Sequence, residues 1–187
     1  MNQQSSEREY RTMNTGQTLL TIGAFIFLTT IMLNFYGLVA NTGDTIASGQ
    51  DGILATTIAA SYMEQAQGLA FDSVSDTSDA ALASPTALTD PTLLGTETGE
   101  DSIKSFSDFD DFNGKDFVKQ ANGTNRQYKT HFDVYYVNPD NINQKSSSRT
   151  YVKRMDIKTW RVYPVATSPT EIDTVRNSLV LGYFHFD

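Results

Sequence analysis

The stretch that decides the fold is residues 19–40, which read LLTIGAFIFLTTIMLNFYGLVA. These 22 residues carry no charge and lie inside an uncharged run of 32 residues, Thr12 to Gly43. As a helix the stretch would be about 33 Å long, which matches the hydrocarbon thickness of a bilayer. We therefore expect a membrane-spanning helix. Arg8 and Arg11 on its short side favour an N-terminus in the cytoplasm and the remainder of the chain outside.

Two other interpretations of this stretch are weaker. A secretory signal peptide has an apolar core of about 7 to 15 residues after a basic start, whereas this core is longer and its start is neutral. Leu38-Val39-Ala40 offers only a weak signal-peptidase site. A buried core helix is disfavoured because the segment before it, residues 1–16, is polar and has no apolar surface to cover it.

Composition excludes several classes of function. The 187 residues carry 22 acids against 14 bases, a net charge of -8, so the chain lacks the basic face that nucleic acid requires. It has no cysteine, which removes disulfides, thiolate zinc sites and cysteine nucleophiles. His131 and His185 show no repeated ligand spacing. We therefore expect neither an enzyme nor a bound cofactor, apart from the calcium site discussed below.

The segment before the apolar stretch resembles a processing signal. Residues 1–16 read MNQQSSEREYRTMNTG, and Gln17-Thr18-Leu19-Leu20 follow at once. A polar leader, a glycine and then an apolar helix resemble the class III signal of type IV pilins and pseudopilins. The resemblance implies cleavage by a prepilin peptidase between Gly16 and Gln17, and removal of the leader from the mature chain.

Two positions differ from the usual pattern of that family. Its members usually have an aromatic residue or Met at the first mature position and a glutamate at the fifth, where this chain has Gln17 and Thr21. The family's glutamate is thought to register a new subunit against its neighbour, so Thr21 occupies the subunit-registering position without the charge. Some minor, tip-located pseudopilins also lack this glutamate, which favours a minor role.

Residues 41–71 follow as an amphipathic helix. Apolar residues recur at steps of three, four and seven on one face, while Asp51 and other polar residues fall on the opposite face. Glycines between Gly37 and Gly52 each cost about 1 kcal/mol relative to alanine, so we expect a kinked or unwound stretch there. The apolar face comprises Ile46, Ile53, Leu54, Ile58, Tyr62, Ala66 and Leu69.

Residues 72–116 form an acidic linker and turn. The linker is rich in Ser, Thr, Asp and Ala and is expected to be irregular. Its end alternates aromatic and acidic residues, and it resembles the corresponding turn of minor pilins and pseudopilins of the type II secretion and mannose-sensitive haemagglutinin groups. Hard oxygen ligands at this spacing could hold Ca²⁺; the other interpretation is a solvated acidic turn pinned by phenylalanines. The candidate ligands are Asp108, Asp110, Asp111, Asn113 and Asp116.

Residues 117–187 are predicted to form an antiparallel sheet of about four strands. Strict alternation over 127–137 places Tyr128, Thr130, Phe132, Val134 and Tyr136 on one buried face. Further strands are expected at 117–120, 150–165 and 178–186, the last of them central because it is apolar. Trp160 is expected to fill the core between sheet and helix. The fold class is α+β, with a long N-terminal helix packed on this sheet.

The sequence thus predicts five segments: a leader (1–16), a transmembrane or filament-core helix (17–40), an amphipathic helix (41–71), the acidic linker and turn (72–116) and the β-domain (117–187). The resemblance implies a structural subunit of a type IV pilus-like or pseudopilus filament. Such a subunit is anchored in the bacterial inner membrane and polymerises with identical or other pilin-like subunits. The alternative is a single-span envelope protein whose β-domain binds a ligand or partner. Residues 44–116 carry a net charge of -12 and residues 117–187 a net charge of +4. Attraction between these two segments could steer contacts between copies of the chain.

Overall fold

The computed structural model describes the backbone of residues 3–76, 82–165 and 174–184, with side chains from Thr15 onward. The chain divides into two compact units, Met1–Ala47 and Ser48–Asp187. Helix α1, Gln3–Gln67, contributes residues to both. The second unit adds a five-stranded antiparallel sheet, so the predicted α+β class, with a helix packed on an antiparallel sheet, is confirmed.

Helix α1 is continuous through the glycines, and the predicted unwinding between Gly37 and Gly52 is wrong. Glycine lowers helix propensity but keeps its backbone N–H, so the ladder of hydrogen bonds is not interrupted. Threonine hydroxyls also bond back to carbonyls one turn earlier, as Thr42 Oγ1 does to the Leu38 oxygen at 2.8 Å. The helix begins inside the expected leader and ends at Gln67 instead of Phe71.

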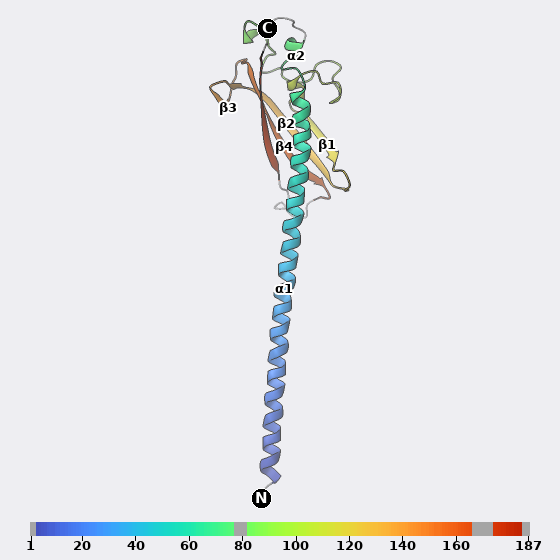
Figure 1. The fold of residues 1–187 in the computed structure, drawn as a ribbon, viewed down its shortest axis with the longest axis vertical. Helices are drawn as coiled ribbons and strands as arrows, with labels where there is room; N and C mark the ends of the chain where they lie inside the picture. The colour runs from blue at the N-terminus through green and yellow to red at the C-terminus, as the bar shows by residue number, and fades with distance from the viewer. Residues whose placement is uncertain (1–2, 77–81, 166–173, 185–187) are drawn as a thin grey trace. The chain divides into compact units, whose positions relative to one another are not determined.

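The sheet of the second unit is antiparallel throughout (Figure 1). Its strand order is β1-β2-β4-β5, and β3 pairs with the end of β2. The last strand lies at the edge, so its predicted central place is wrong. The strand that the sequence did not predict, β3, falls in the polar segment between the two long strands. The bounds are β1 Asp116–Gln120, β2 Gln127–Asn138, β3 Asn141–Lys145, β4 Val152–Tyr163 and β5 Val175–Gly182.

One face of the sheet is covered by the C-terminal part of α1 (Figure 1). The predicted alternation of β2 is confirmed, since all five residues assigned to its inner face are buried. On the helix the prediction holds for Ile58, Tyr62 and Ala66, which are buried, but not for Ile46 and Ile53, which are 57% and 68% exposed. The core combines these helix residues with Phe106, Phe109, Phe112, Phe132, Met155 and Ile157.

Trp160 lies on the outer face of β4, contrary to the prediction. It is half-buried and lies opposite Lys129 of β2, whose Nζ is 5.7 Å from the centre of the indole ring. Side chains alternate between the two faces of a strand, and Trp160 has an even number whereas Met155 and Ile157, which point toward the helix, have odd numbers. Core packing therefore depends on phenylalanine, tyrosine and aliphatic residues of the inner face.

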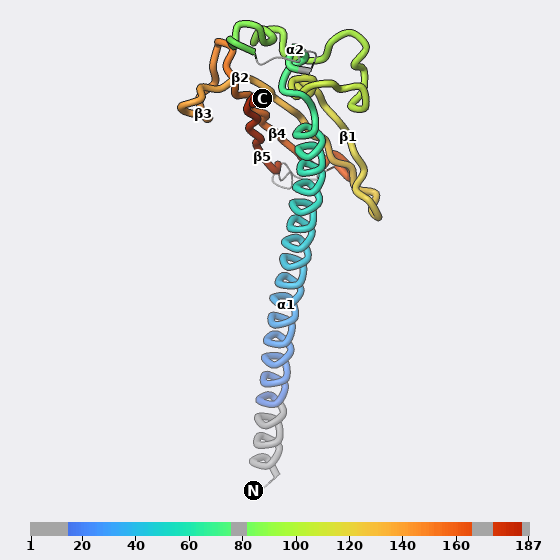
Figure 2. Tube along the Cα trace, turned by 45° about the horizontal axis from the view of Figure 1, so that its top comes forward, coloured from blue at the N-terminus to red at the C-terminus, as the bar shows by residue number. Residues whose placement is uncertain are grey.

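The connection between helix and sheet is irregular where it is described, as predicted, and Figure 2 shows it looping beside the end of α1. It contains only short helical turns: α2 Ser73–Asp76, η1 Pro85–Ala87 and η2 Phe109–Phe112. After α1 the chain runs beside the acidic turn, because Ala70 N donates to the Ser107 oxygen and Phe109 N donates to the Ala70 oxygen. This pairing brings Asp72 close to η2.

Candidate functional site

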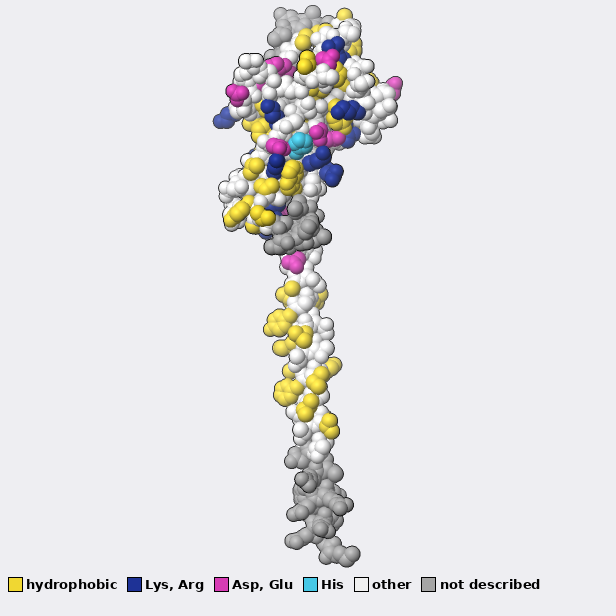
Figure 3. Space-filling view, turned by 180° about the vertical axis from the view of Figure 1, so that it is seen from behind, with side chains coloured by type: hydrophobic (Ala, Val, Ile, Leu, Met, Phe, Trp, Pro, Cys, Tyr) yellow, Lys and Arg dark blue, Asp and Glu magenta, His cyan; other side chains and the backbone are white. Residues whose placement is uncertain are grey.

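The apolar segment of α1 exposes its side chains within the first unit (Figure 3). Between Leu19 and Val39, fourteen large apolar side chains are 48–76% exposed. Consecutive residues such as Phe25, Ile26 and Phe27 are all exposed, so the apolar surface surrounds the helix instead of forming one stripe. By length and composition this helix could cross a membrane.

Polar side chains within this segment bond to the helix itself. Thr29 and Thr30 donate to the carbonyls of Phe25 and Ile26 at 2.8 Å. Thr21, at the predicted subunit-registering position, donates to the carbonyl of Gln17 at 2.9 Å. Hydroxyls bonded in this way can enter an apolar environment at low cost. The predicted cleavage junction, Gly16 and Gln17, lies within helix α1 and is exposed.

Three of the five predicted metal ligands, Asp108, Asp110 and Asp111, are fully buried, so a solvated acidic turn is wrong. Asp108 Oδ1 accepts the Asp110 N–H at 2.9 Å, and Asp111 Oδ2 accepts the N–H groups of Ser107 and Asp108 at 2.8 and 3.0 Å. These bonds cap the turn η2 at its N-terminus. The second oxygen of each carboxylate has no hydrogen-bond partner among the described residues.

The other two predicted ligands, Asn113 and Asp116, have partners elsewhere. Asn113 donates from Nδ2 to the Leu94 oxygen at 3.0 Å and accepts the Val134 N–H at Oδ1 at 2.9 Å. Asp116 Oδ1 lies 2.8 Å from Nδ1 of His131 on the outer face of the sheet. The five predicted ligands therefore do not form a single group.

A lysine, which the sequence did not single out, neutralises part of the acidic turn. Lys153 lies on the inner face of β4, and its Nζ donates to the Phe71 oxygen and Asp72 Oδ2, both at 2.8 Å, and to Asp110 Oδ1. Its side chain and those of both aspartates have no exposed surface. The rings of Phe71 and Tyr136 lie 4.8 and 5.4 Å from the ammonium. This buried cluster joins the segment after α1 to the sheet.

Burial and neighbouring charges shift the carboxyl groups of the cluster in opposite directions. Burial by itself would raise the pKa of Asp72, but the Lys153 ammonium and hydrogen bonds from Thr89 and Val74 outweigh it, so that pKa lies below its ordinary value. Burial and the adjacent charge of Asp110 raise the pKa of Asp108 to about 8. Asp72 is therefore ionised at neutral pH, whereas Asp108 keeps its proton more readily than an ordinary aspartate, which limits the negative charge that Lys153 must balance.

Because the pKa of Asp72 is lower in the folded chain than its ordinary 3.8, its ionised form stabilises the fold at neutral pH. That stabilisation is lost as the pH falls below 3.8 toward the folded-state pKa. We expect Asp72→Asn to unfold at lower urea concentration than wild type at pH 7, with a difference that shrinks at pH 3. Urea titrations of the full chain in detergent micelles measure this difference. An equal difference at both values of pH would contradict it.

Much of the predicted charge complementarity is used inside the second unit. Asp51, expected on the polar face of α1, is buried and accepts bonds from Arg126 and Tyr128 at 2.7 Å, with Arg161 at 3.4 Å. Asp90 pairs with Arg149 at 3.1 Å. These ion pairs within the chain leave fewer charged side chains of residues 44–116 and 117–187 for contacts between copies.

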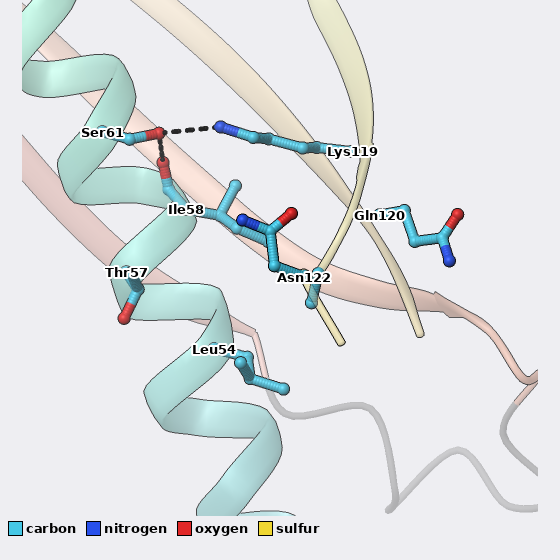
Figure 4. Close-up of a pocket in the computed structure, with 8 residues that line it drawn as sticks. Leu54, Thr57, Ile58, Ser61, Lys119, Gln120 and Asn122 are labelled. Atoms are coloured by element: carbon cyan, nitrogen blue, oxygen red, sulfur yellow. Dashed lines mark hydrogen bonds between the residues drawn. The ribbon is translucent and has the colours of Figure 1, made fainter. Parts of the chain in front are cut away.

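The remaining candidates are a surface group and a groove. His131 lies on the outer face of the sheet between Asp116 and Asp133, as in an exposed ion-pair row; His185 lies outside the described residues. A groove of about 180 Å³ lies between α1 and β1 (Figure 4). At one end of the groove Ser61 Oγ accepts a bond from Lys119 Nζ at 3.3 Å.

Comparisons of the chain with protein-family models, with curated proteins and with solved structures found no match.

Proposed function

We propose that the protein is a structural subunit of a type IV pilin-like filament, anchored by residues 17–40 in a bacterial inner membrane before assembly. The observation that carries the proposal is the exposure of apolar side chains on all sides of α1 between Leu19 and Val39. A helix that is apolar all round is stable where lipid or other apolar helices cover it. Outside the bilayer, packing among neighbouring helices stabilises it by about 25 cal/mol per Å² of buried apolar area.

One feature of the sequence supports filament assembly over permanent anchoring, and a second favours a minor place in the filament. Gly16 and Gln17 stand where a prepilin peptidase would cleave, immediately before the apolar segment. Thr21 replaces the charged residue that would register a subunit, and its hydroxyl bonds within the helix. A subunit without that charge fits a minor position in a mixed filament, beside pilin-like subunits that carry it.

Processing of the leader tests the proposal. We expect the protein from native membranes to have the mass of residues 17–187, and Gly16→Val to keep the mass of the full chain because a branched side chain replaces the glycine at the cleaved bond. Intact mass spectrometry measures both. Gly23→Val, in the same helix but away from the junction, is the matched control and should be cleaved as wild type. A full-length wild-type chain would contradict the proposal.

A second candidate is a single-span anchor whose β-domain binds another envelope protein or a ligand. The groove lined by Leu54, Ile58 and Lys119 between α1 and β1 favours it, since a cleft with an apolar wall and a cation can hold a polar end of a partner. This function predicts a full-length chain that stays in the membrane fraction. Recovery of the cleaved chain in filaments sheared from the cell surface would exclude it.

A further inference from the structure

Three carboxylates converge beside the acidic turn, in a place that the sequence did not indicate. One oxygen from each of Glu97, Glu100 and Asp111 lies within 4.8 Å of one oxygen of the other two. Among the described residues, none of the ion pairs includes these three side chains. Three negative groups so close together repel one another unless a positive charge or shared protons offset them.

A glycine turn brings the two glutamates together. The backbone N–H of Glu100 donates to the backbone carbonyl oxygen of Glu97 at 3.3 Å, and the backbone N–H of Glu97 donates to the side-chain Oε2 of Glu100 at 2.9 Å. Gly99 has a φ of +101°, a conformation that residues with a side chain rarely adopt. The turn therefore holds both side chains on the same side, facing Asp111.

Asp111 supplies a second, independent sign of a ligand. It has no exposed surface, and its Oδ2 is fixed by two backbone N–H groups, of Ser107 and Asp108. Its Oδ1 is buried and receives no N–H or O–H bond from the described residues, while the carboxylate faces the two glutamates and interacts with the side chain of Glu100, which is itself an acid. A buried carboxylate oxygen without a partner is costly, and a bound cation would remove that cost.

We propose that Glu97, Glu100 and Asp111 bind a calcium ion. Calcium–oxygen distances of about 2.3–2.6 Å allow two ligands of one ion to lie up to about 5.2 Å apart, and the three oxygens meet this limit. Glu97 is exposed and Glu100 half-buried, so water can complete the coordination on the open side. Calcium accepts such an irregular set, whereas magnesium requires a near-ideal octahedron. The site shares only Asp111 with the ligand set expected from the sequence.

Calorimetric titration of the full chain, in detergent micelles and stripped of metal with EDTA, tests the proposal. We expect one calcium ion per chain at pH 7.5, with weaker binding of magnesium. Glu100→Gln keeps an oxygen to accept the Glu97 N–H but removes the charge, and should weaken calcium binding by about tenfold or more. Glu97→Gln, at an exposed position that leaves the core intact, should do the same.

The matched control is Asp90→Asn, which removes one carboxylate of the same linker that is paired with Arg149 and lies outside the cluster. It should bind calcium as wild type does. The proposal is overturned if wild type binds no calcium, which leaves shared protons to offset the carboxylates. It is also overturned if Asp90→Asn loses as much affinity as Glu100→Gln, or if magnesium binds as tightly as calcium.

Discussion

Replacing Lys153 with methionine is expected to lower the free energy of unfolding by about 3–5 kcal/mol, because two buried carboxylates then lose their cation. Lys153 Nζ bonds to Asp72, Asp110 and the Phe71 oxygen, and all three side chains of the ion cluster have no exposed surface. Methionine fills a similar volume but supplies no donor. Since small domains are stable by about 5–15 kcal/mol, this loss is a large share of the total. Urea unfolding of the full chain in micelles, followed by near-UV circular dichroism, measures it.

Lys158→Met is the matched control, because Lys158 lies on the outer face of the same strand. It pairs with Asp133 at 3.1 Å, but its side chain is 40% exposed, so its removal should cost less than about 1 kcal/mol. Adding Asp72→Asn and Asp110→Asn to Lys153→Met should restore part of the stability, since neither former partner of Lys153 then carries a buried charge. Equal losses for Lys153→Met and Lys158→Met would contradict the assigned role of Lys153.

Lys153 could have been found from the sequence by strand parity. Along β4, residues 153, 155, 157 and 159 share one face, and Met155 and Ile157 mark that face as the inner one. A lysine at the same parity is then predicted to be buried and paired. Trp160 stands on the opposite face of the strand, so the expectation that it fills the core mixed the two faces. No local pattern could have identified Asp72 as the partner of Lys153. Asp72 reaches the turn η2 because backbone hydrogen bonds join Ala70 to Ser107 and Phe109.

Periodicity predicted the elements of the fold but not the neighbours of each strand. The alternation over Tyr128–Tyr136 and the apolar run of α1 are local signals, and both were confirmed. The place of β5 was not, because apolar content does not distinguish a central strand from an edge strand with one face on the core. Leu179 of β5 is buried, while Val180 is 37% exposed, as in a strand covered on one face.

The acidic groups show the same limit of sequence reasoning. Spacing suggested one metal site over 108–116, yet capping bonds and Lys153 take up Asp108 and Asp110, and His131 lies beside Asp116. The cluster that does converge joins residues 97–100 to Asp111, and its local signal was a glycine at the third position of the turn Glu-Thr-Gly-Glu. The packing of the segment after α1 decides that the turn at residues 97–100 faces Asp111. Spacing along the sequence does not encode that packing.

Placing an arginine in the middle of the apolar segment, as in Leu28→Arg, should abolish incorporation into filaments while the chain stays in the membrane. A charged residue at the centre of a span costs about 2.5–3.5 kcal/mol, and each Leu, Ile, Phe or Val in the span offsets about 0.3–0.6 kcal/mol. Eleven exposed Leu, Ile, Phe and Val residues remain between Leu19 and Val39 when Leu28 is replaced, and we expect them to retain the helix in the bilayer. In a filament core the same arginine would be buried among apolar helices without a partner.

The measurement is the share of the protein found in filaments sheared from the cell surface against the share in membranes. Thr56→Arg is the matched control, because Thr56 is exposed on the same helix but lies in the second unit, and it should be incorporated as wild type. Leu28→Met, which keeps the position apolar, should also be incorporated. If Leu28→Arg reached sheared filaments at the wild-type level, close packing of this segment against neighbouring helices would be refuted, because a buried arginine without a partner is not compatible with such a core.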